Sequence, residues 1–280
     1  MKRAGVIGWP IRHSRSPLIH GYWLRILGIA GAYDRIAVPP EELADFIARI
    51  ADGELVGCNV TIPHKEAVIA HVHVADPLQR RIGSINTIYI DAAGRVAGES
   101  TDGHGFWAAL ADQVPAKRLS EIERILVMGA GGASRAVVAM LYSQTAAQVT
   151  VAARDIARAG AICDIIGDTR IDPTTWEDIP DRLRSADLIV NTTPLGMSGY
   201  PDLNLDLEHA RPGAIAYDLV YVPLETTFLR DARRHGLTAV DGVGMLLHQA
   251  APGFEKWFGV RPEVTAELRS IVVRDIESGS

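Results

Sequence analysis

A glycine-rich segment in the middle of the chain restricts the fold more than any other feature. Four apolar residues at 125–128 precede Gly129-Ala130-Gly131-Gly132-Ala133-Ser134, and a helical pattern then runs to about Tyr142. Small residues between a strand and a helix permit a tight turn and let backbone N–H groups approach a pyrophosphate closely. The segment predicts the first βα unit of a Rossmann domain that binds a dinucleotide along Gly129, Ala130, Gly131, Gly132 and Ala133. A turn of this composition can also serve packing alone.

Short apolar runs alternate with helical patterns along the whole chain, which predicts an α/β protein. After 125–128, the second half continues with strands expected at 148–153, 188–190, 214–218 and 237–240, and with a helix at 225–235. The first half has strands expected at 4–8, 33–38 and 55–62, helices at 18–27 and 40–50, and a hairpin of 84–91 with 95–99 around Ala93-Gly94. Because a hairpin is antiparallel, the first sheet should be mixed.

The length of 280 residues favours two domains, since single cores stop growing at roughly 250–300 residues. We expect a substrate-binding catalytic domain over 1–103 and a Rossmann dinucleotide-binding domain over 104–242. Two helical segments, 243–258 and 262–276, have no strand of their own to cover. Residues 243–280 should therefore pack back on the first domain, complete it and close a cleft.

The composition argues against large anionic partners. The formal net charge is −6, so no diffuse basic surface is available for nucleic acid or an anionic membrane, and a small-molecule substrate is expected. Cys58 and Cys163 are far apart and match neither a disulfide framework nor metal spacing, and the nine histidines show no metal-ligand spacing either. With no apolar stretch of membrane-spanning length, these features predict a cytoplasmic protein without a metal.

Charged residues after the second strand of the Rossmann half bear on cofactor choice. The strand ends near Ala153, and Arg154, Asp155 and Arg158 follow. Arginines at this position bind the 2′-phosphate of NADP, whereas a carboxylate binds the ribose hydroxyls of NAD. The two arginines favour NADP, with NAD as the alternative. Asp155 can also be a helix N-cap beside two arginines that are simply solvated.

Polar residues follow several strand ends of the first half, where ligands of α/β sheets bind. They are Ser14, Ser16, Asn59, Thr61, Lys65, Asn86, Thr101 and Asp102. Ser14 and Ser16 are two residues apart, so in an extended segment their hydroxyls point to one side and can bind a carboxylate. A lysine is usually only a surface residue. Lys65 and Asp102 at adjacent strand ends, however, can form the acid–base pair that carbonyl reduction requires.

Several long motifs, in one order over nearly the whole chain, resemble the shikimate dehydrogenase family. They are Gly8-Trp9-Pro10-Ile11-Arg12-His13-Ser14-Arg15-Ser16-Pro17, Asn59-Val60-Thr61-Ile62-Pro63-His64-Lys65, Gly83-Ser84-Ile85-Asn86-Thr87, Thr101-Asp102-Gly103, the glycine-rich turn, Asn191-Thr192-Thr193-Pro194-Leu195-Gly196-Met197, Tyr217-Asp218-Leu219-Val220-Tyr221 and Gly244-Met245-Leu246-Leu247-His248-Gln249.

The resemblance implies residue roles. Lys65 and Asp102 would be catalytic. Ser14, Ser16 and Tyr217 would bind the substrate carboxylate, while Thr61, Asn86 and Gln249 would surround its ring hydroxyls. The cofactor would lie along the glycine-rich turn, the Arg154 region, Thr192, Thr193, Met197, Leu219 and Gly242. Two departures stand out: Gly21 replaces a usual Asn in the first helix, and Ala153-Arg154-Asp155 replaces Asn-Arg-Thr. The carboxylate of Asp155 should repel a 2′-phosphate.

The implied function is the reduction of 3-dehydroshikimate to shikimate in aromatic amino acid biosynthesis. One alternative is an NAD-dependent quinate/shikimate dehydrogenase, which Asp155 favours. Another is a non-catalytic regulator that binds shikimate or quinate. The presence of both Lys65 and Asp102 argues against that regulator.

Overall fold

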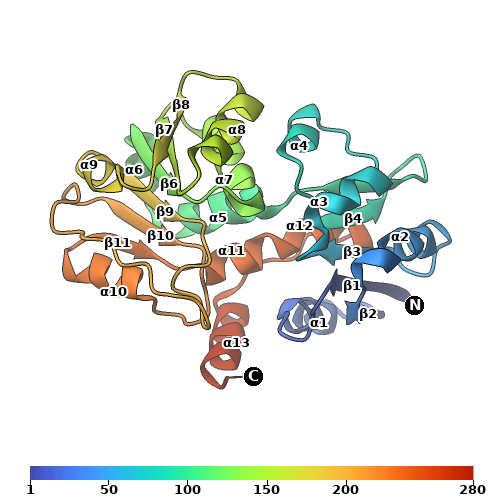
Figure 1. The fold of residues 1–280 in the computed structure, drawn as a ribbon. Coiled ribbons are helices and arrows are strands. Elements are labelled where there is room, and N and C mark those ends of the chain that lie inside the picture. Colours follow the sequence, from blue (N-terminus) through green and yellow to red (C-terminus); the bar gives the residue numbers. More distant parts are fainter. Residues whose placement is uncertain (280) are drawn as a thin grey trace.

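Residues 1–279, which the computed structural model describes, form two α/β parts that lie side by side (Figure 1). The first sheet has the order β2-β1-β3-β4-β5, with β1 Lys2–Gly8, β2 Gly31–Ala37, β3 Gly57–Val60, β4 Thr87–Ile90 and β5 Val96–Glu99. Strand β1 pairs in parallel with β2 and β3, whereas β4 is antiparallel to β3 and β5. The predicted mixed sheet and hairpin are confirmed.

Short helices connect the strands of this first part. They are α1 Ser16–Ile26, the 3-10 turn η1 Pro40–Glu42, α2 Leu43–Ala51, α3 His64–Ala67, η2 Val68–His71 and α4 Pro77–Ile82. Helix α2 buries Leu43, Phe46, Ile47 and Ile50, spaced three and four apart, on the sheet. The expected helix at 40–50 therefore exists, but its first turn is a 3-10 turn that begins at Pro40.

The second sheet is entirely parallel and has the order β11-β10-β9-β6-β7-β8. Its strands are β6 Arg124–Met128, β7 Gln148–Ala153, β8 Ile171–Thr175, β9 Leu188–Asn191, β10 Ile215–Asp218 and β11 Thr238–Val240. Counted from β6, this is the strand order of a Rossmann dinucleotide-binding fold. The edge strand β8 was not predicted, because Pro173 interrupts its apolar pattern; an edge tolerates proline since only one side of the strand is paired.

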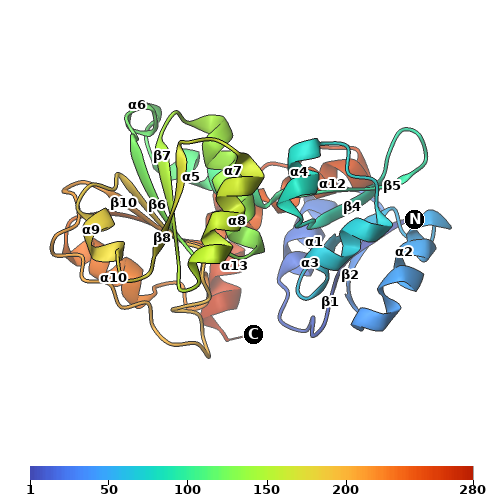
Figure 2. The same ribbon diagram turned by 45° about the horizontal axis from the view of Figure 1, so that its top comes forward.

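Helices cover both faces of the second sheet (Figure 2). They are α5 Asp102–Gln113, α6 Ala116–Ser120, α7 Gly132–Gln144, α8 Ile156–Ile166, α9 Ile179–Leu183 and α10 Thr227–Arg234. Successive residues of β6 serve opposite faces: Val127 packs in one core cluster, while Leu126 and Met128 pack in the other. Such strands are apolar throughout, which is why 125–128 was recognisable in the sequence.

The C-terminal helices return to the first part, as expected. They are α11 Val243–His248, α12 Ala250–Phe258 and α13 Ala266–Glu277, so the single helix expected at 243–258 is divided into two at Gln249. Phe254 and Trp257 of α12 share a core cluster with Trp23 of α1. Trp257 also donates its indole N–H to the Ile88 carbonyl of β4, 2.8 Å away.

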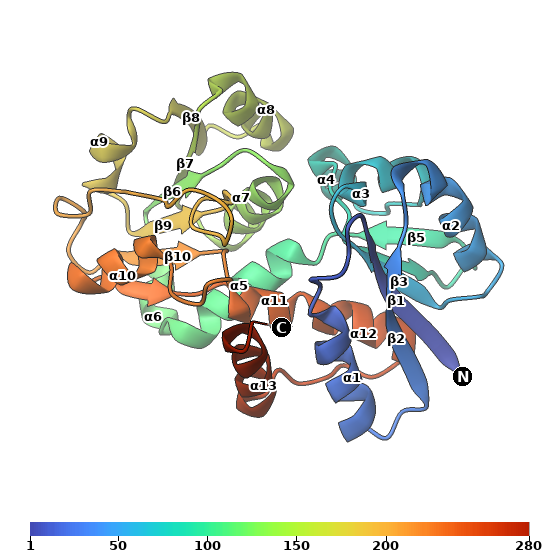
Figure 3. The same cartoon turned by 60° about the horizontal axis from the view of Figure 1, so that its bottom comes forward.

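Helices α5 and α11 lie where the two parts meet (Figure 3). They approach closely because α5 has glycine at the contact: a Cβ on Gly105 would lie 2.8 Å from the Met245 carbonyl oxygen. This contact holds Asp102, the first residue of α5, beside the start of α12. Within residues 1–279, no helix combines the length and the apolar character needed to cross a membrane.

Gly57→Ala should lower the free energy of unfolding by about 2 kcal/mol. The new Cβ would lie 2.2 Å from the Ile88 carbonyl oxygen and 2.3 Å from Trp257 Nε1, at a φ of +148°. The control is Gly21→Ala in α1, where a Cβ meets nothing within 4 Å. It should instead stabilise by roughly 0.5–1 kcal/mol. Chemical denaturation measures both, and an unchanged Gly57→Ala protein would contradict this packing.

Candidate active site

A cavity of about 630 Å³ opens between the two parts. It lies beyond the carboxyl ends of β1 and β3 on one side and near those of β10 and β11 on the other, where α/β sheets bind ligands. Seven of the predicted substrate and catalytic residues line it: Ser14, Ser16, Thr61, Lys65, Asn86, Asp102 and Gln249. They come from segments up to 235 positions apart, and the fold brings them to one place.

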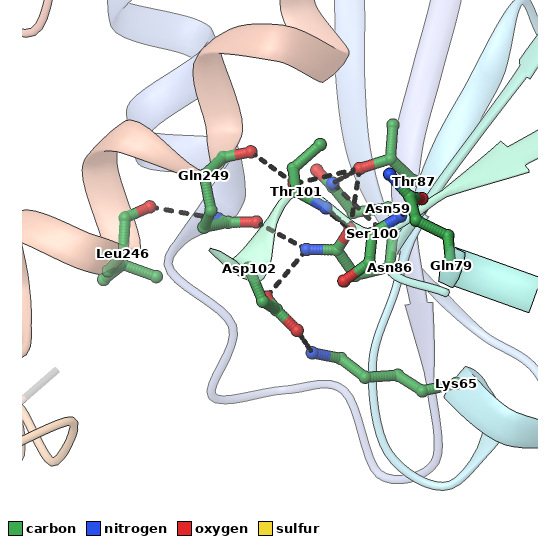
Figure 4. Close-up of polar contacts among 10 residues, drawn as sticks. All are labelled: Asn59, Lys65, Gln79, Asn86, Thr87, Ser100, Thr101, Asp102, Leu246 and Gln249. Atoms are coloured by element: carbon green, nitrogen blue, oxygen red, sulfur yellow. Dashed lines mark hydrogen bonds and ion pairs between the residues drawn. The ribbon is translucent and has the colours of Figure 1, made fainter. Parts of the chain in front are cut away.

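Lys65 and Asp102 form an ion pair in this cavity, with 2.6 Å between Nζ and Oδ2 (Figure 4). Lys65 lies in the short helix α3, which follows β3. The side chain of Lys65 is 26% exposed and that of Asp102 is 6% exposed. The carboxylate is at the first position of α5, where the helix dipole favours a negative charge. The ammonium is thus more accessible to a ligand than the carboxylate, although both residues line the cavity.

Asn86 links this pair to the C-terminal helices. Its Nδ2 donates to Asp102 Oδ1 at 2.8 Å and to Gln249 Oε1 at 3.2 Å. Its Oδ1 accepts from the backbone N–H of Thr101 at 2.8 Å, so the amide cannot rotate without losing bonds at both ends. Gln249 is fixed in turn by two hydrogen bonds. Its side-chain Nε2 donates to the Leu246 carbonyl, and its backbone carbonyl accepts from the Thr101 hydroxyl.

The two serines form a separate polar corner of the cavity. Their hydroxyl oxygens are 3.3 Å apart, so they point to one side as their spacing predicted. Arg35 of β2 donates to the Ser14 carbonyl at 2.8 Å and holds this segment against the sheet. Arg15, between the serines, also lines the cavity and pairs with Asp275 of α13 at 2.8 Å. The corner combines hydroxyl donors with positive charge, which suits a carboxylate.

The structure does not place Tyr217 in the cavity. Its side chain is fully buried and stacks on Phe106, with 4.7 Å between the ring centres. Tyr217 lies inside β10, whereas Tyr221 follows the end of the strand and lines the cavity. Burial raises the pKa of Tyr221, so its phenol is a neutral hydrogen-bond donor. The expectation that Tyr217 lies at the substrate is therefore corrected: Tyr221 is the tyrosine of this motif that reaches the cavity, because it lies beyond the strand end.

Other lining residues were not among those predicted for the site. Trp9 is 50% exposed and Tyr200 is 52% exposed, and they approach the cavity from different parts of the molecule. Large exposed aromatic side chains at a cavity are typical of ligand contacts. Met245 and Leu246 also contribute to the lining, as does Asn59, which the sequence had indicated only as a polar residue at a strand end.

The glycine-rich turn follows β6 and ends at α7, as predicted. Gly129 has a φ of +116°, and a Cβ there would lie 2.5 Å from Thr192 Oγ1. Around Gly131, the N-cap of α7, a Cβ would meet no atom within 4 Å, so the backbone is open on that side. Ser134 donates to the Gly129 carbonyl at 2.6 Å and closes the turn. This is an open, positively polarised helix N-terminus that fits a pyrophosphate.

The remaining residues predicted for the cofactor lie around this turn. Ala133, Met197, Leu219 and Gly242 line the cavity. Thr192 donates to the Met128 carbonyl and Thr193 to Asn191 Oδ1, both at 2.7 Å, which fixes the loop after β9 beside the turn after β6. The strands β6 and β9 are neighbours, so these two loops meet at the same edge of the sheet.

Arg154, Asp155 and Arg158 follow β7, the other neighbour of β6, and all three are exposed. Asp155 is the N-cap of α8 and accepts the Ala157 N–H at 3.0 Å. Arg158 reaches back to the glycine-rich turn, where its Nη2 lies 3.5 Å from the Ala130 carbonyl oxygen. The capping interpretation of Asp155 therefore applies, while Arg158 provides a positive charge beside the turn.

A buried carboxylate organises the loops after β9 and β10. Asp218 accepts hydrogen bonds from Asn191 Nδ2 at 2.9 Å, from the Val220 N–H at 3.0 Å and from the Thr226 hydroxyl at 2.6 Å. Burial raises the pKa of Asp218 to about 6, although these three bonds oppose the rise. The loops that carry Met197 and Tyr221 are thus tied to one titrating group.

The sequence matches three family profiles that together cover most of the chain. Residues 6–88 match the shikimate dehydrogenase substrate binding domain, residues 111–195 match shikimate / quinate 5-dehydrogenase, and residues 242–266 match the shikimate 5′-dehydrogenase C-terminal domain. A shikimate dehydrogenase (NADP(+)) of Brucella abortus is 48% identical over 98% of this chain and 95% of the relative. A shikimate dehydrogenase (NADP(+)) of Methylobacterium radiotolerans is also 48% identical, over 98% of this chain and 97% of the relative.

Among the solved structures with the same fold, some are complexes with NADP(H) and others are complexes with NAD. The shikimate 5-dehydrogenase of Thermus thermophilus in complex with NADP(H) and shikimate has a TM-score of 0.85 and 35% identity, over 99% of this chain and 100% of that one. The quinate dehydrogenase of Corynebacterium glutamicum in complex with NAD has a TM-score of 0.87 and 29% identity, over 98% of this chain and 99% of that one.

Asp218→Asn should change how stability depends on pH. The folded pKa of about 6 is above the ordinary value of about 3.9, so between these pH values the folded protein binds more protons than the unfolded chain. The free energy of unfolding of the wild type should therefore fall, relative to the variant, as pH rises from about 4 to about 6, by up to about 3 kcal/mol. Denaturation of both proteins across this range measures the difference, and parallel pH profiles would refute the assignment.

Proposed function

The chain belongs to the shikimate dehydrogenase family, and from this premise we propose that it reduces 3-dehydroshikimate to shikimate with NADPH, a step of aromatic amino acid biosynthesis. The observation that carries the proposal is the Lys65–Asp102 pair, which faces the cavity with Lys65 Nζ 2.6 Å from the carboxylate. Carbonyl reduction needs a proton donor at the carbonyl oxygen, and a positioned lysine can act in that role. The most direct test is turnover of shikimate and of quinate, each with NADP and with NAD.

The serine corner is proposed to bind the substrate carboxylate. Ser14 and Ser16 offer two hydroxyl donors, and Tyr221 offers a third from the opposite part of the molecule. Arg15, whose charge is paired with Asp275, lines the cavity at the same place. Thr61, Asn86 and Gln249 line the other side and are proposed to bind the ring hydroxyls.

Lys65 is proposed to donate the proton from Nζ to the carbonyl oxygen, while Asp102 orients the ammonium. The side chain of Asp102 is 6% exposed and hydrogen-bonded to Asn86, so it holds Lys65 in one position without contacting solvent freely. In the reverse direction Lys65 accepts the proton from the substrate hydroxyl. General acid–base groups of this kind contribute about 10²–10⁴ in rate.

The residues of the second part fit a dinucleotide. The open backbone at Gly131 and the N-terminus of α7 suit the pyrophosphate, while Met197, Leu219 and Gly242 line the cavity on the side of the second sheet. When bound, NADPH supplies the hydride. For the 2′-phosphate, Arg154 and Arg158 are proposed as the binding groups, supported by their exposure at the end of β7 and by the approach of Arg158 to Ala130.

A second candidate, an NAD-dependent quinate/shikimate dehydrogenase, is favoured by one observation. Asp155 is a carboxylate at the end of β7, where it would repel a 2′-phosphate and could accept ribose hydroxyls. Against this candidate, the relatives that are 48% identical to the chain carry NADP(+) in their names, which supports NADP as the cofactor here.

Two further assignments complete the proposal. Residues 1–103 with 243–280 are proposed as the substrate-binding catalytic domain and 104–242 as the dinucleotide-binding domain, supported by the shared core of α1, α12 and α13. A cytoplasmic location is proposed because Cys58 and Cys163 are both free, as in proteins of reducing compartments.

Lys65→Ala should lower kcat by about 100-fold or more and change KM for shikimate only modestly, because it removes the proton donor and leaves the carboxylate corner intact. Lys256→Ala is a matched control: this lysine is also paired with a carboxylate, Glu99 at 3.2 Å, but does not line the cavity. Steady-state kinetics of both variants decide the point, and near-normal turnover by Lys65→Ala would exclude it as the proton donor.

Asp155→Thr should tighten NADP binding, since it removes a negative charge and keeps a side chain that can cap α8. Arg154→Ala should weaken NADP by about 1.5–3 kcal/mol and hardly affect NAD. Titration of each variant with both cofactors measures these effects. If Asp155→Thr abolishes NAD activity and Arg154→Ala leaves NADP unaffected, the second candidate is correct.

A further inference from the structure

We propose that Tyr33 is a positioning residue for the substrate, acting through the amide of Asn59; the inference rests on the proposed function. Tyr33 is the only buried residue of the edge strand β2. Its hydroxyl donates to Asn59 Oδ1, with 2.5 Å between the oxygens. Asn59 lines the cavity, whereas Tyr33 does not. Tyr33 can therefore act on a ligand in the cavity only through Asn59.

The strand register explains how an edge residue reaches the centre of the site. Tyr33 is aligned with Ala4 of β1, which is aligned with Gly57 of β3, so these three share one face of the sheet. Asn59 is two residues after Gly57 and is therefore on the same face. On this face the small Ala4 lies between Tyr33 and Gly57, while Trp257 occupies the space where a Gly57 side chain would be.

The hydroxyl of Tyr33 adds a third hydrogen bond to the Asn59 amide, whose orientation is set by the Asn86 carbonyl. With Oδ1 facing the phenol, Nδ2 donates to the Asn86 carbonyl at 3.1 Å and to Thr87 Oγ1 at 3.3 Å. A rotated amide would turn Oδ1 towards the Asn86 carbonyl oxygen and lose both donated bonds. Asn59 is buried, so the lost bonds would not be replaced readily by water.

From Asn59 the hydrogen bonds continue to the catalytic pair. Asn59 holds the backbone of Asn86, and the Asn86 side chain holds Asp102, which holds Lys65. Burial raises the pKa of Tyr33 well above its ordinary value, so the phenol stays protonated and can donate to Asn59.

His20 fixes the ring of Tyr33. The imidazole of this α1 residue stacks on the phenol ring, with 3.9 Å between centres and 9° between planes. The His20 and Tyr33 side chains are both buried, and the His20 ring also contacts the rings of Trp23, Phe254 and Trp257. Burial lowers the pKa of His20 to about 3, so the ring stays neutral in the working pH range and adds no charge beside the site. The phenol can only rotate about its C–O bond.

Tyr33→Phe tests the proposal, with Tyr22→Phe as the matched control. Tyr22 is also buried, and its hydroxyl donates to a carboxylate, Glu267 at 2.9 Å, but it is remote from Asn59. We expect Tyr33→Phe to raise KM for shikimate about tenfold, the factor that corresponds to one hydrogen bond to a buried group, with a smaller fall in kcat. KM for NADP should stay within about twofold, and Tyr22→Phe should match the wild type.

A double-mutant cycle shows whether Tyr33 acts through Asn59. In an Asn59→Ala background, Tyr33→Phe should leave KM for shikimate unchanged, because the contact through which it acts is gone. Equal kinetics of Tyr33→Phe and wild type would overturn the inference and leave the proposed function intact. A parallel loss of NADP and shikimate affinity with a lowered melting temperature would also overturn it, since the effect would be structural. A wild type that does not turn over shikimate would overturn both.

Discussion

The ion pair of Lys65 and Asp102 is the interaction on which the rest of the site depends. A carboxylate that is nearly removed from water is stabilised only when its partner and its hydrogen bonds are all in place. Asp102 therefore needs Lys65 on one oxygen and Asn86 on the other. Asn86 needs the backbone of Thr101 and the side chain of Gln249. Each requirement recruits a further segment, until α3, β4, α5 and α12 are fixed relative to one another.

Contacts between the two parts place the dinucleotide turn next to this pair. Arg135 of α7 donates to the Ile82 carbonyl at 2.9 Å and forms an ion pair with Glu66, the residue after Lys65. The helix whose N-terminus fits a pyrophosphate is therefore connected to the turn that carries the proposed proton donor. Ser84 packs against Gly132 at the same junction. Substrate and cofactor groups are brought to one cavity by a small number of such contacts.

Buried polar groups serve different purposes in the two parts. In the first part, Tyr33, Asn59 and Asn86 are neutral and fully hydrogen-bonded, which fixes their orientation without a charge to desolvate. In the second, Asp218 is a carboxyl group that burial makes easier to protonate, and it connects the loops of Met197 and Tyr221. Moderate acidity should thus act on the loops of Met197 and Tyr221 through Asp218, whereas the three neutral groups of the first part keep their hydrogen bonds.

Local patterns in the sequence determined much of the fold and of the site. The apolar run before Gly129, the alternation of strands and helices, and the hairpin around Gly94 were all readable because each depends on residues close together in the chain. Ser14, Ser16, Lys65 and Asp102 were identified for the same reason, within motifs that also resemble a known family.

Only the tertiary structure decided what depends on position in space. Tyr217 and Tyr221 are four residues apart in one motif, and the end of β10 places the first in the core and the second in the cavity. Strand β8 exists because pairing with β7 overcomes a proline that is unfavourable locally. The bond from Tyr33 to Asn59 depends on the register of three strands, and no local pattern encodes such a register. Side-chain contacts across a sheet are set by pairing between distant segments, so the sequence could supply the residues but not their partners.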